Sequence, residues 1–199
     1  MKLIAHRRNT LEELLATPRS CGVEVDIRSR GNALIAQHEP YVPGTDFQRW
    51  LEAFDHKTLI LNVKEEGLEE QLLQLMDERG VQDFFFLDQS FPHLVKWARS
   101  GEDRSAVRVS EYESIDTALA LTGFCRWIWV DCFSKFPLIR EDIDRLKEAD
   151  FMLCLASPEL HGGDAHRLIP AMRADLARVG VQVDAVCSKL PHLWQESID

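Results

Sequence analysis

The sequence has no apolar run near the roughly 20 residues that a membrane-spanning helix needs, and the apolar stretch in MKLIAHRRNT is shorter than the apolar part of a signal peptide. Basic residues are also scarce, with 23 Lys and Arg against 33 Asp and Glu and a formal net charge of -10. Surfaces that bind nucleic acids usually carry a basic stripe, so this balance argues against such a partner. An anionic substrate stays open, because a metal ion or a few local cations can make a positive pocket. We expect a cytoplasmic protein without a membrane span.

Paired cysteines and a glycine-rich phosphate turn are missing as well. The five cysteines form no metal-binding or redox spacing, and several lie in apolar runs such as FMLCLA (151–156). Buried, reduced thiols are the expectation. The first strand-like run is followed by HRRNT, without the glycines of a nucleotide-binding turn. That lack argues against a doubly wound open sheet, the alternative fold.

What the sequence does contain is a regular alternation over all 199 residues. Near-continuous apolar runs, typical of buried parallel strands, alternate with amphipathic, helix-like segments. The strand-like runs are 2–6, 22–27, 58–64, 82–88, 105–110, 126–131, 151–157 and 183–188. The helix-like segments are 10–16, 46–54, 68–80, 91–100, 114–121, 140–149 and 164–180. This pattern predicts a compact (β/α)₈ TIM barrel of the α/β class, formed by residues 1–199 as a single domain.

In such a barrel the active site lies where the strands end. The expected strand ends carry polar or aromatic side chains, which we take as candidates: His6, Arg7, Glu24, Asp26, Asn62, Lys64, Asp88, Arg108, Glu111, Trp129 and Asp131. Asp88 and Asp131 are explained equally well as helix N-caps or solvated loop residues. His161 lies in the glycine-rich loop after the seventh expected strand and is a further candidate.

Two pairs at spacing two stand out among these candidates. Glu24 and Asp26 share one face of a strand, and so do Asn62 and Lys64. Two buried carboxylates repel each other and need a cation between them to stay charged. Oxygen ligands from Glu, Asp and Asn favour a hard divalent ion, so we predict a site for Mg²⁺, with Ca²⁺ or Mn²⁺ as alternatives.

These residues stand in four segments that resemble the glycerophosphodiester phosphodiesterases: AHRRNTLEEL (5–14), GVEVDIRSRGNALIAQHEP (22–40), LILNVKEE (59–66) and VDAVCSKLP (183–191). The resemblance implies that His6 and His38 form an acid–base pair. It also implies that Glu24 and Asp26 bind the metal, with Asn62 at the third ligand position, and that Arg7 and Lys64 hold the phosphate. The implied activity is metal-dependent hydrolysis of a glycerophosphodiester-like or other polyol phosphodiester, a small-molecule substrate.

The sequence departs from the family pattern at several positions. Asn62 stands where the family has an acidic ligand, so the ion would bind more weakly or recruit Asp88 or Glu111. Arg8 replaces a glycine, Ser188-Lys189 replaces Thr-Asp, and the insertion after the second histidine is missing. Three alternatives remain. One is a metal-independent lyase, in which Arg28 takes the place of the metal and the product is a cyclic phosphate. Another is a barrel that binds a phosphorylated ligand without catalysis. The third is a barrel enzyme of a different kind, such as a sugar isomerase or an aldolase.

Overall fold

The computed structural model describes residues 1–195, and its elements alternate as the sequence predicts. The strands are β1 (Lys2–Ala5), β2 (Gly22–Arg30), β3 (Ala33–Ala36), β4 (Thr45–Asp46), β5 (Leu59–Val63), β6 (Phe84–Leu87), β7 (Ala106–Val109), β8 (Trp127–Val130), β9 (Met152–Ala156) and β10 (Ala185–Ser188). The helices are α1 (Leu11–Ala16), α2 (Phe47–Glu52), α3 (Glu69–Glu78), α4 (Phe91–Arg99), α5 (Ile115–Leu119), α6 (Arg140–Glu148) and α7 (Ala165–Val179), with 3₁₀ turns η1 (Pro158–His161) and η2 (Pro191–Trp194).

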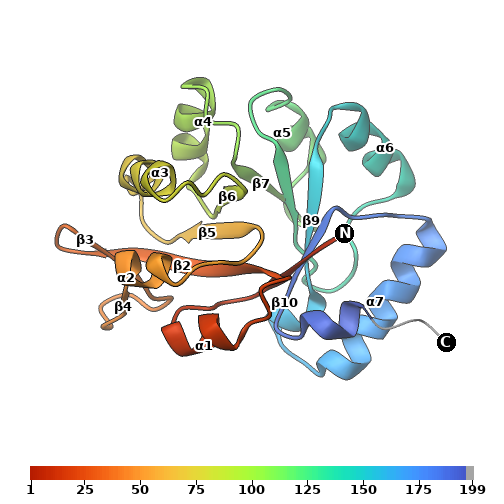
Figure 1. Cartoon of the computed structure of the whole chain (residues 1–199). Helices are drawn as coiled ribbons and strands as arrows, with labels where there is room; N and C mark the ends of the chain where they lie inside the picture. Colours follow the sequence, from red (N-terminus) through yellow and green to blue (C-terminus); the bar gives the residue numbers. More distant parts are fainter. Residues whose placement is uncertain (196–199) are drawn as a thin grey trace.

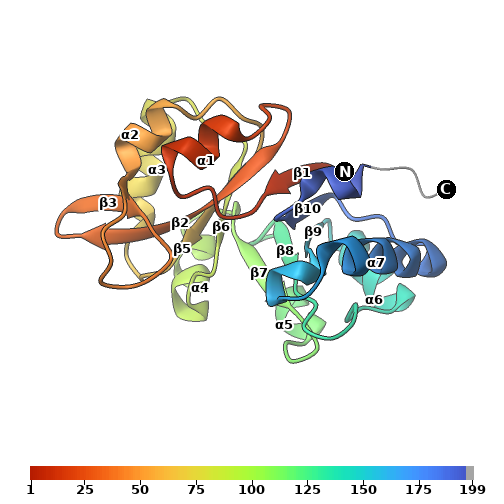
Figure 2. The ribbon, with the colours of Figure 1, turned by 90° about the horizontal axis from the view of Figure 1, so that it is seen from below.

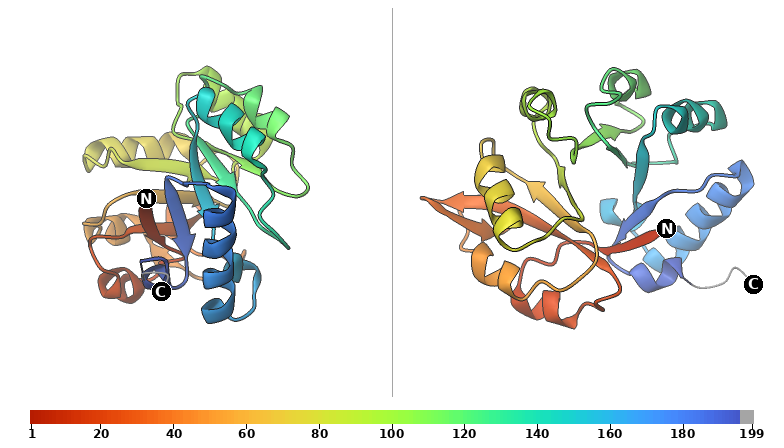
Figure 3. Two further views of the ribbon diagram at one scale, coloured as in Figure 1. Left: turned by 90° about the vertical axis from the view of Figure 1, so that its right-hand side faces the viewer. Right: turned by 45° about the horizontal axis from the view of Figure 1, so that its top comes forward.

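The strands form one curled sheet with the helices outside it (Figure 1 and Figure 3). Neighbouring strands of the series β6, β5, β2, β1, β10, β9, β8 and β7 pair in parallel. These strands correspond to the eight predicted runs, and all seven predicted helices are present. The short strands β3 and β4 were not predicted. They add an antiparallel extension to β2, which projects beyond the helices (Figure 2).

The two ends of the series, β6 and β7, meet at one isolated parallel bridge between Phe86 and Ser105. This bridge includes a backbone hydrogen bond of 2.8 Å from the Phe86 N–H to the Arg104 carbonyl. Elsewhere in the series each pair of strands has a ladder. The α/β class is therefore confirmed as a curled, barrel-like sheet, whereas the fully laddered ring that the sequence predicts is replaced by this seam between β6 and β7.

Side chains alternate between two environments along every strand, because successive residues point to opposite faces. On the inner face, apolar residues such as Ile4, Ile60, Phe85, Trp127 and Cys187 pack into one cluster. On the outer face two larger clusters lie under the helices, one around β1, β2, β5 and β6 and one mostly around β7 to β10. Polar side chains that lie in phase with this inner cluster, further along a strand, therefore also point to the inner face.

Local signals in the sequence account for where the helices start and stop. Thr10 and Glu13 form a reciprocal capping box at the start of α1, which satisfies two free backbone donors. Helix α7 ends at Gly180, whose φ of 70° lies in the left-handed region that glycine tolerates. At Gly22 a Cβ atom would lie 2.5 Å from the Thr58 carbonyl oxygen. Glycine is therefore needed there for the chain before β5 to approach β2.

All five cysteines are buried free thiols, as expected. Among residues 1–195, no helix is long and apolar enough to cross a membrane.

Glu159 ties the ends of β9 and β10 together although only 2% of it is exposed. Its carboxylate accepts bonds from the Ser188 hydroxyl at 2.7 Å, the Lys189 N–H at 3.0 Å and the Ser157 hydroxyl. We expect Glu159→Ala to lower the free energy of unfolding by about 3 kcal/mol, because it leaves buried donors without an acceptor. Chemical denaturation measures this. The exposed Glu148→Ala is the control, expected within about 0.5 kcal/mol of the parent protein; equal losses in the two variants would contradict the assignment.

Candidate active site

The predicted site residues continue the inner face of the sheet at the carboxyl ends of its strands. Glu24 and Asp26 alternate with outer-face residues on β2, and Asp26 lies opposite Asn62 of β5 in the parallel register. Lys64, two residues after Asn62, lies on the same face just beyond the end of β5. Across the sheet, Arg108 of β7 and Asp131 after β8 hold equivalent positions, with Arg108 opposite Trp129. We call this set of strand ends the carboxyl rim.

Glu24 and Asp26 are both fully buried, with exposures of 0%. Glu24 accepts a bond of 2.7 Å from the Asn62 amide and one of 2.5 Å from the Arg7 N–H. Arg7 has a positive φ of 53°, which is uncommon outside glycine. Asp26 exchanges two bonds with Asn9, one of 2.8 Å from the Asn9 amide and one of 2.9 Å from its own N–H. The carboxylate pair is therefore held by amide and backbone donors from β5 and from the loop after β1.

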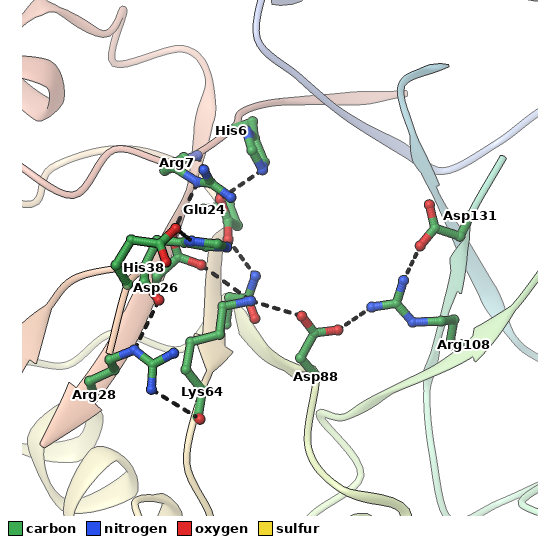
Figure 4. A network of polar contacts seen from close by, with 12 residues as sticks. His6, Arg7, Glu24, Asp26, Arg28, His38, Lys64, Asp88, Arg108 and Asp131 are labelled. Carbon is green, nitrogen blue, oxygen red and sulfur yellow. Dashed lines mark hydrogen bonds and ion pairs between the residues drawn. The ribbon is translucent and has the colours of Figure 1, made fainter. Parts of the chain in front are cut away.

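Two cations flank Asp26, and one of them starts a longer chain of contacts (Figure 4). The Arg7 Nε atom and the Lys64 Nζ atom each lie 3.3 Å from an oxygen of Asp26. Lys64 also donates to Asp88 at 2.9 Å. Asp88 in turn pairs with Arg108, and Arg108 with Asp131. The structure thus joins these predicted residues into one alternating network of charges along the carboxyl rim.

The environment shifts the pKa values of Glu24 and His6 in opposite directions. Burial, followed by the charge of Asp26, raises the pKa of Glu24 to about 7. Burial, followed by the charge of Arg7, lowers the pKa of His6 to about 3, and Lys189 and Lys64 act in the same direction. The His6 Nε2 atom lies 3.8 Å from a Glu24 oxygen. His6 is therefore a neutral imidazole near neutral pH, able to accept a proton.

His38 and Arg28 lie at the edge of this network, on the β2–β3 extension. The His38 Nδ1 atom is bonded to Glu39 at 2.8 Å, and 34% of the histidine side chain is exposed. The Arg28 Nε atom donates to the His38 carbonyl at 2.9 Å, and its Nη1 atom lies 3.5 Å from Glu65. His38 and Arg7 line one cavity of about 460 Å³. The guanidinium group of Arg28 therefore contacts His38 and Glu65.

The oxygens around Glu24 suit a hard cation. The Oδ1 atoms of Asp26 and Asn62 are buried and accept no hydrogen bond. Together with Glu24 they form an all-oxygen donor set, the kind that Mg²⁺ and Ca²⁺ prefer. Within the described residues no three His, Cys, Asp or Glu side chains gather as a metal site, and the third oxygen of this set is that of the Asn62 amide. Any ion would share Asp26 with the ammonium group of Lys64.

Trp129 and Glu111, which the sequence marks as possible pocket residues, make packing and backbone contacts in the structure. Trp129 is 5% exposed and packs in the inner apolar cluster. Glu111 accepts backbone bonds from Phe133 at 3.0 Å, Ser134 at 2.6 Å and Lys135 at 3.0 Å. Its carboxylate therefore holds the backbone of the loop after β8 by hydrogen bonds. Asp88 does not cap helix α4, whose N-cap is Ser90, and instead bridges Lys64 and Arg108.

The carboxylate of Glu111 predicts a pH dependence of stability. Burial raises the pKa of Glu111, but the bonds from Ser134, Lys135 and Phe133 outweigh it and lower the pKa from an ordinary 4.5 to about 2. A carboxylate whose pKa is lower in the folded than in the unfolded state stabilises the fold fully at a pH above its unfolded pKa of 4.5. This stabilisation is lost as the pH falls from 4.5 to about 2. We expect Glu111→Gln to lower Tm at pH 7 and to have no effect near pH 2. A Tm difference independent of pH would contradict this, as measured by thermal scans of both proteins.

Three residues of the site were missed or undervalued at the sequence level. Asn9 anchors Asp26, and its position in the HRRNT segment was the available signal. Lys189 follows β10 and depresses the pKa of His6. His161 is bonded through Nε2 to Asp131, a contact across 30 residues that no local pattern indicates.

Known proteins that resemble this chain are found by its structure and not by its sequence. No known protein family and no curated protein matches its sequence. The crystal structure of a glycerophosphodiester phosphodiesterase from Agrobacterium tumefaciens str. C58 has a TM-score of 0.71, at 14% identity over 98% of this chain and 100% of that one. A glycerophosphoryl diester phosphodiesterase from Parabacteroides distasonis gives 0.66, at 16% identity over 96% and 84%.

The same fold is found in a protein of another kind. The tryptophan synthase α-subunit of Pyrococcus furiosus has a TM-score of 0.57, at 12% identity over 96% of this chain and 88% of that one. One fold hosts many functions, so function has to be argued from the site. The chain therefore shares, over nearly its whole length, a fold found in glycerophosphodiester phosphodiesterases and in a tryptophan synthase α-subunit.

Proposed function

We propose that the protein is a phosphodiesterase that hydrolyses a small diester such as a glycerophosphodiester, with its active site at Glu24, Asp26 and His6. The observation that carries this is a buried carboxylate pair beside a neutral imidazole, with Arg7 and Lys64 flanking Asp26. Cations fixed at this position stabilise the charge that grows on a phosphoryl group in the transition state. The fold shared with two phosphodiesterases supports it, and we infer that the curled sheet is their barrel with a loosened β6–β7 seam.

Each residue has a role in this proposal. Arg7 and Lys64 bind the phosphate oxygens. His6 accepts a proton from the attacking water, and His38, which lines one cavity with Arg7, protonates the leaving oxygen. Glu24, Asp26 and Asn62 would hold a divalent ion, which supplies charge neutralisation at the phosphate. The buried Oδ1 atoms of Asp26 and Asn62, which accept no hydrogen bond, support this assignment.

A panel of diesters tests the proposal. The protein is incubated with glycerophosphodiesters and aryl diesters, with Mg²⁺, Mn²⁺ or Ca²⁺ in turn and with a strong chelator. Release of a phosphomonoester that depends on an added ion is the expected result. Binding of a phosphorylated ligand by calorimetry without turnover of any diester would refute catalysis.

A metal-independent lyase is the second candidate, favoured by one observation. Asp26 already has two cations at 3.3 Å, so the pair is partly neutralised without an ion. In this reaction a neighbouring hydroxyl of the substrate attacks phosphorus, and the product is a cyclic phosphate. Cyclic phosphate formed in the presence of the chelator would support it, and activity that is lost with the chelator and restored by Mg²⁺ would refute it.

A further inference from the structure

A second polar cluster lies on the carboxyl rim, across from Glu24 and Asp26, and its centre is Asp131 (Figure 4). Asp131 is 1% exposed, and both of its oxygens have partners: Oδ1 bonds to His161 Nε2, and Oδ2 bonds to Arg108. Arg108 is held in addition by Asp88, with Glu113 at 3.9 Å. The position of Asp131 is therefore fixed from two sides, and so is the imidazole that it binds.

This contact determines which nitrogen of His161 carries the proton. A buried carboxylate paired with an arginine is ionised and only accepts hydrogen bonds. The Nε2 atom must therefore be the donor, and in a neutral ring Nδ1 is then an acceptor. Burial, followed by the charge of Arg108, lowers the pKa of His161, which agrees with a neutral ring. The side chain is 30% exposed, and within residues 1–195 Nδ1 has no hydrogen-bond partner.

The imidazole of His161 is oriented by packing as well as by hydrogen bonding. The ring of Phe133 lies 4.5 Å from it, between centroids. The backbone of Phe133 is in turn bonded to the carboxylate of Glu111 at 3.0 Å. The charge of Lys189 lowers the pKa of both His161 and His6, so both imidazoles lie within range of one ammonium group. A free acceptor is thus held at the same rim as the proposed phosphate site.

We propose that His161 is a specificity-determining residue whose Nδ1 accepts a hydrogen bond from a hydroxyl group on the alcohol part of the substrate. The inference rests on the proposed function and deepens it, since it selects diesters of polyols over diesters of simple alkyl alcohols. Asp131 acts as a positioning residue, because it fixes the tautomer and the orientation of the ring. A substrate without a free hydroxyl loses nothing when this acceptor is removed.

Two substrates with the same leaving group test the proposal: glyceryl p-nitrophenyl phosphate and n-propyl p-nitrophenyl phosphate, which differ only in two hydroxyls. In His161→Gln the amide can still donate to Asp131, but the acceptor at the Nδ1 position is gone. We expect this variant to lose about tenfold in kcat/KM on the glyceryl ester, the size of one hydrogen bond, and to keep its rate on the propyl ester. His161→Asn, whose amide oxygen reaches the Nδ1 position, should retain part of the preference.

The exposed His166→Asn is the matched control and should leave both rates unchanged. An equal loss on both esters, or no loss on either, would overturn the role of His161. If the parent protein cleaves neither ester, the proposed function fails, but calorimetry with glycerol 3-phosphate and propyl phosphate still decides the inference. About tenfold weaker binding of glycerol 3-phosphate alone to His161→Gln would support it, and equal affinities in the parent protein and the variant would refute it.

Discussion

Replacing His6 with alanine is expected to lower kcat/KM for diester hydrolysis by roughly 10²–10⁴-fold, the contribution of one positioned acid–base group. Only 14% of the His6 side chain is exposed, and its low pKa keeps the ring neutral near neutral pH. Without it, the attacking water has no acceptor for its proton beside the Glu24–Asp26 pair. Initial rates of phosphomonoester release at neutral pH measure the effect.

The control for this variant is His166→Ala, on the exposed start of α7, which should keep the parental rate. Thermal scans of both variants establish that they are folded. Full activity in His6→Ala would remove His6 from the mechanism, whatever the fold of the chain.

Lys64→Met is expected to lower the free energy of unfolding by about 3 kcal/mol, because it breaks a buried ion pair and leaves the partner charge behind. The Lys64 side chain is 15% exposed, and its ammonium group lies 3.3 Å from Asp26 and 2.9 Å from Asp88. Methionine keeps much of the apolar stem, so the loss reports on the charge. Denaturant titrations measure it, with the exposed Lys57→Met as control.

A double-mutant cycle with Asp26→Asn separates this pair from general damage. If the two residues stabilise each other, the double variant loses less than the sum of the single losses, by about 1 kcal/mol or more. Strictly additive losses would contradict the pairing. Because a divalent ion could replace the missing charge, Mg²⁺ or Ca²⁺ should raise the Tm of Lys64→Met more than that of the parent protein.

Much of the fold could be predicted from the sequence because strand and helix periods are local. The eight apolar runs and seven amphipathic segments each carry their own signal, and the structure confirms all of them within a few residues. The β2–β3 extension was missed because Arg28, Ser29 and Arg30 continue the strand past its apolar part. The β6–β7 seam depends on how far apart two strands lie, which no local pattern encodes.

For the site as well, local spacing could be predicted from the sequence, whereas long-range contacts could not. The spacing of Glu24 and Asp26 predicts that they share a face, and the structure places both on the inner face with no exposure. The contacts that define Glu111 and His161 join residues 22 to 30 positions apart. Such contacts follow from the register of β7, β8 and β9, so the sequence could mark these residues as candidates without assigning their partners. The metal and the His6–His38 pair stay predictions.

The seam between β6 and β7 divides more than the sheet. The two outer apolar clusters also separate close to this line, one under the helices of the first half of the chain and one mostly under those of the second. Cooperative units in proteins often follow such boundaries, and they open with their own free energies. Amide exchange should therefore distinguish two halves, with the amides flanking Phe86 and Ser105 exchanging through a local opening that leaves the ladder of β1 and β10 protected.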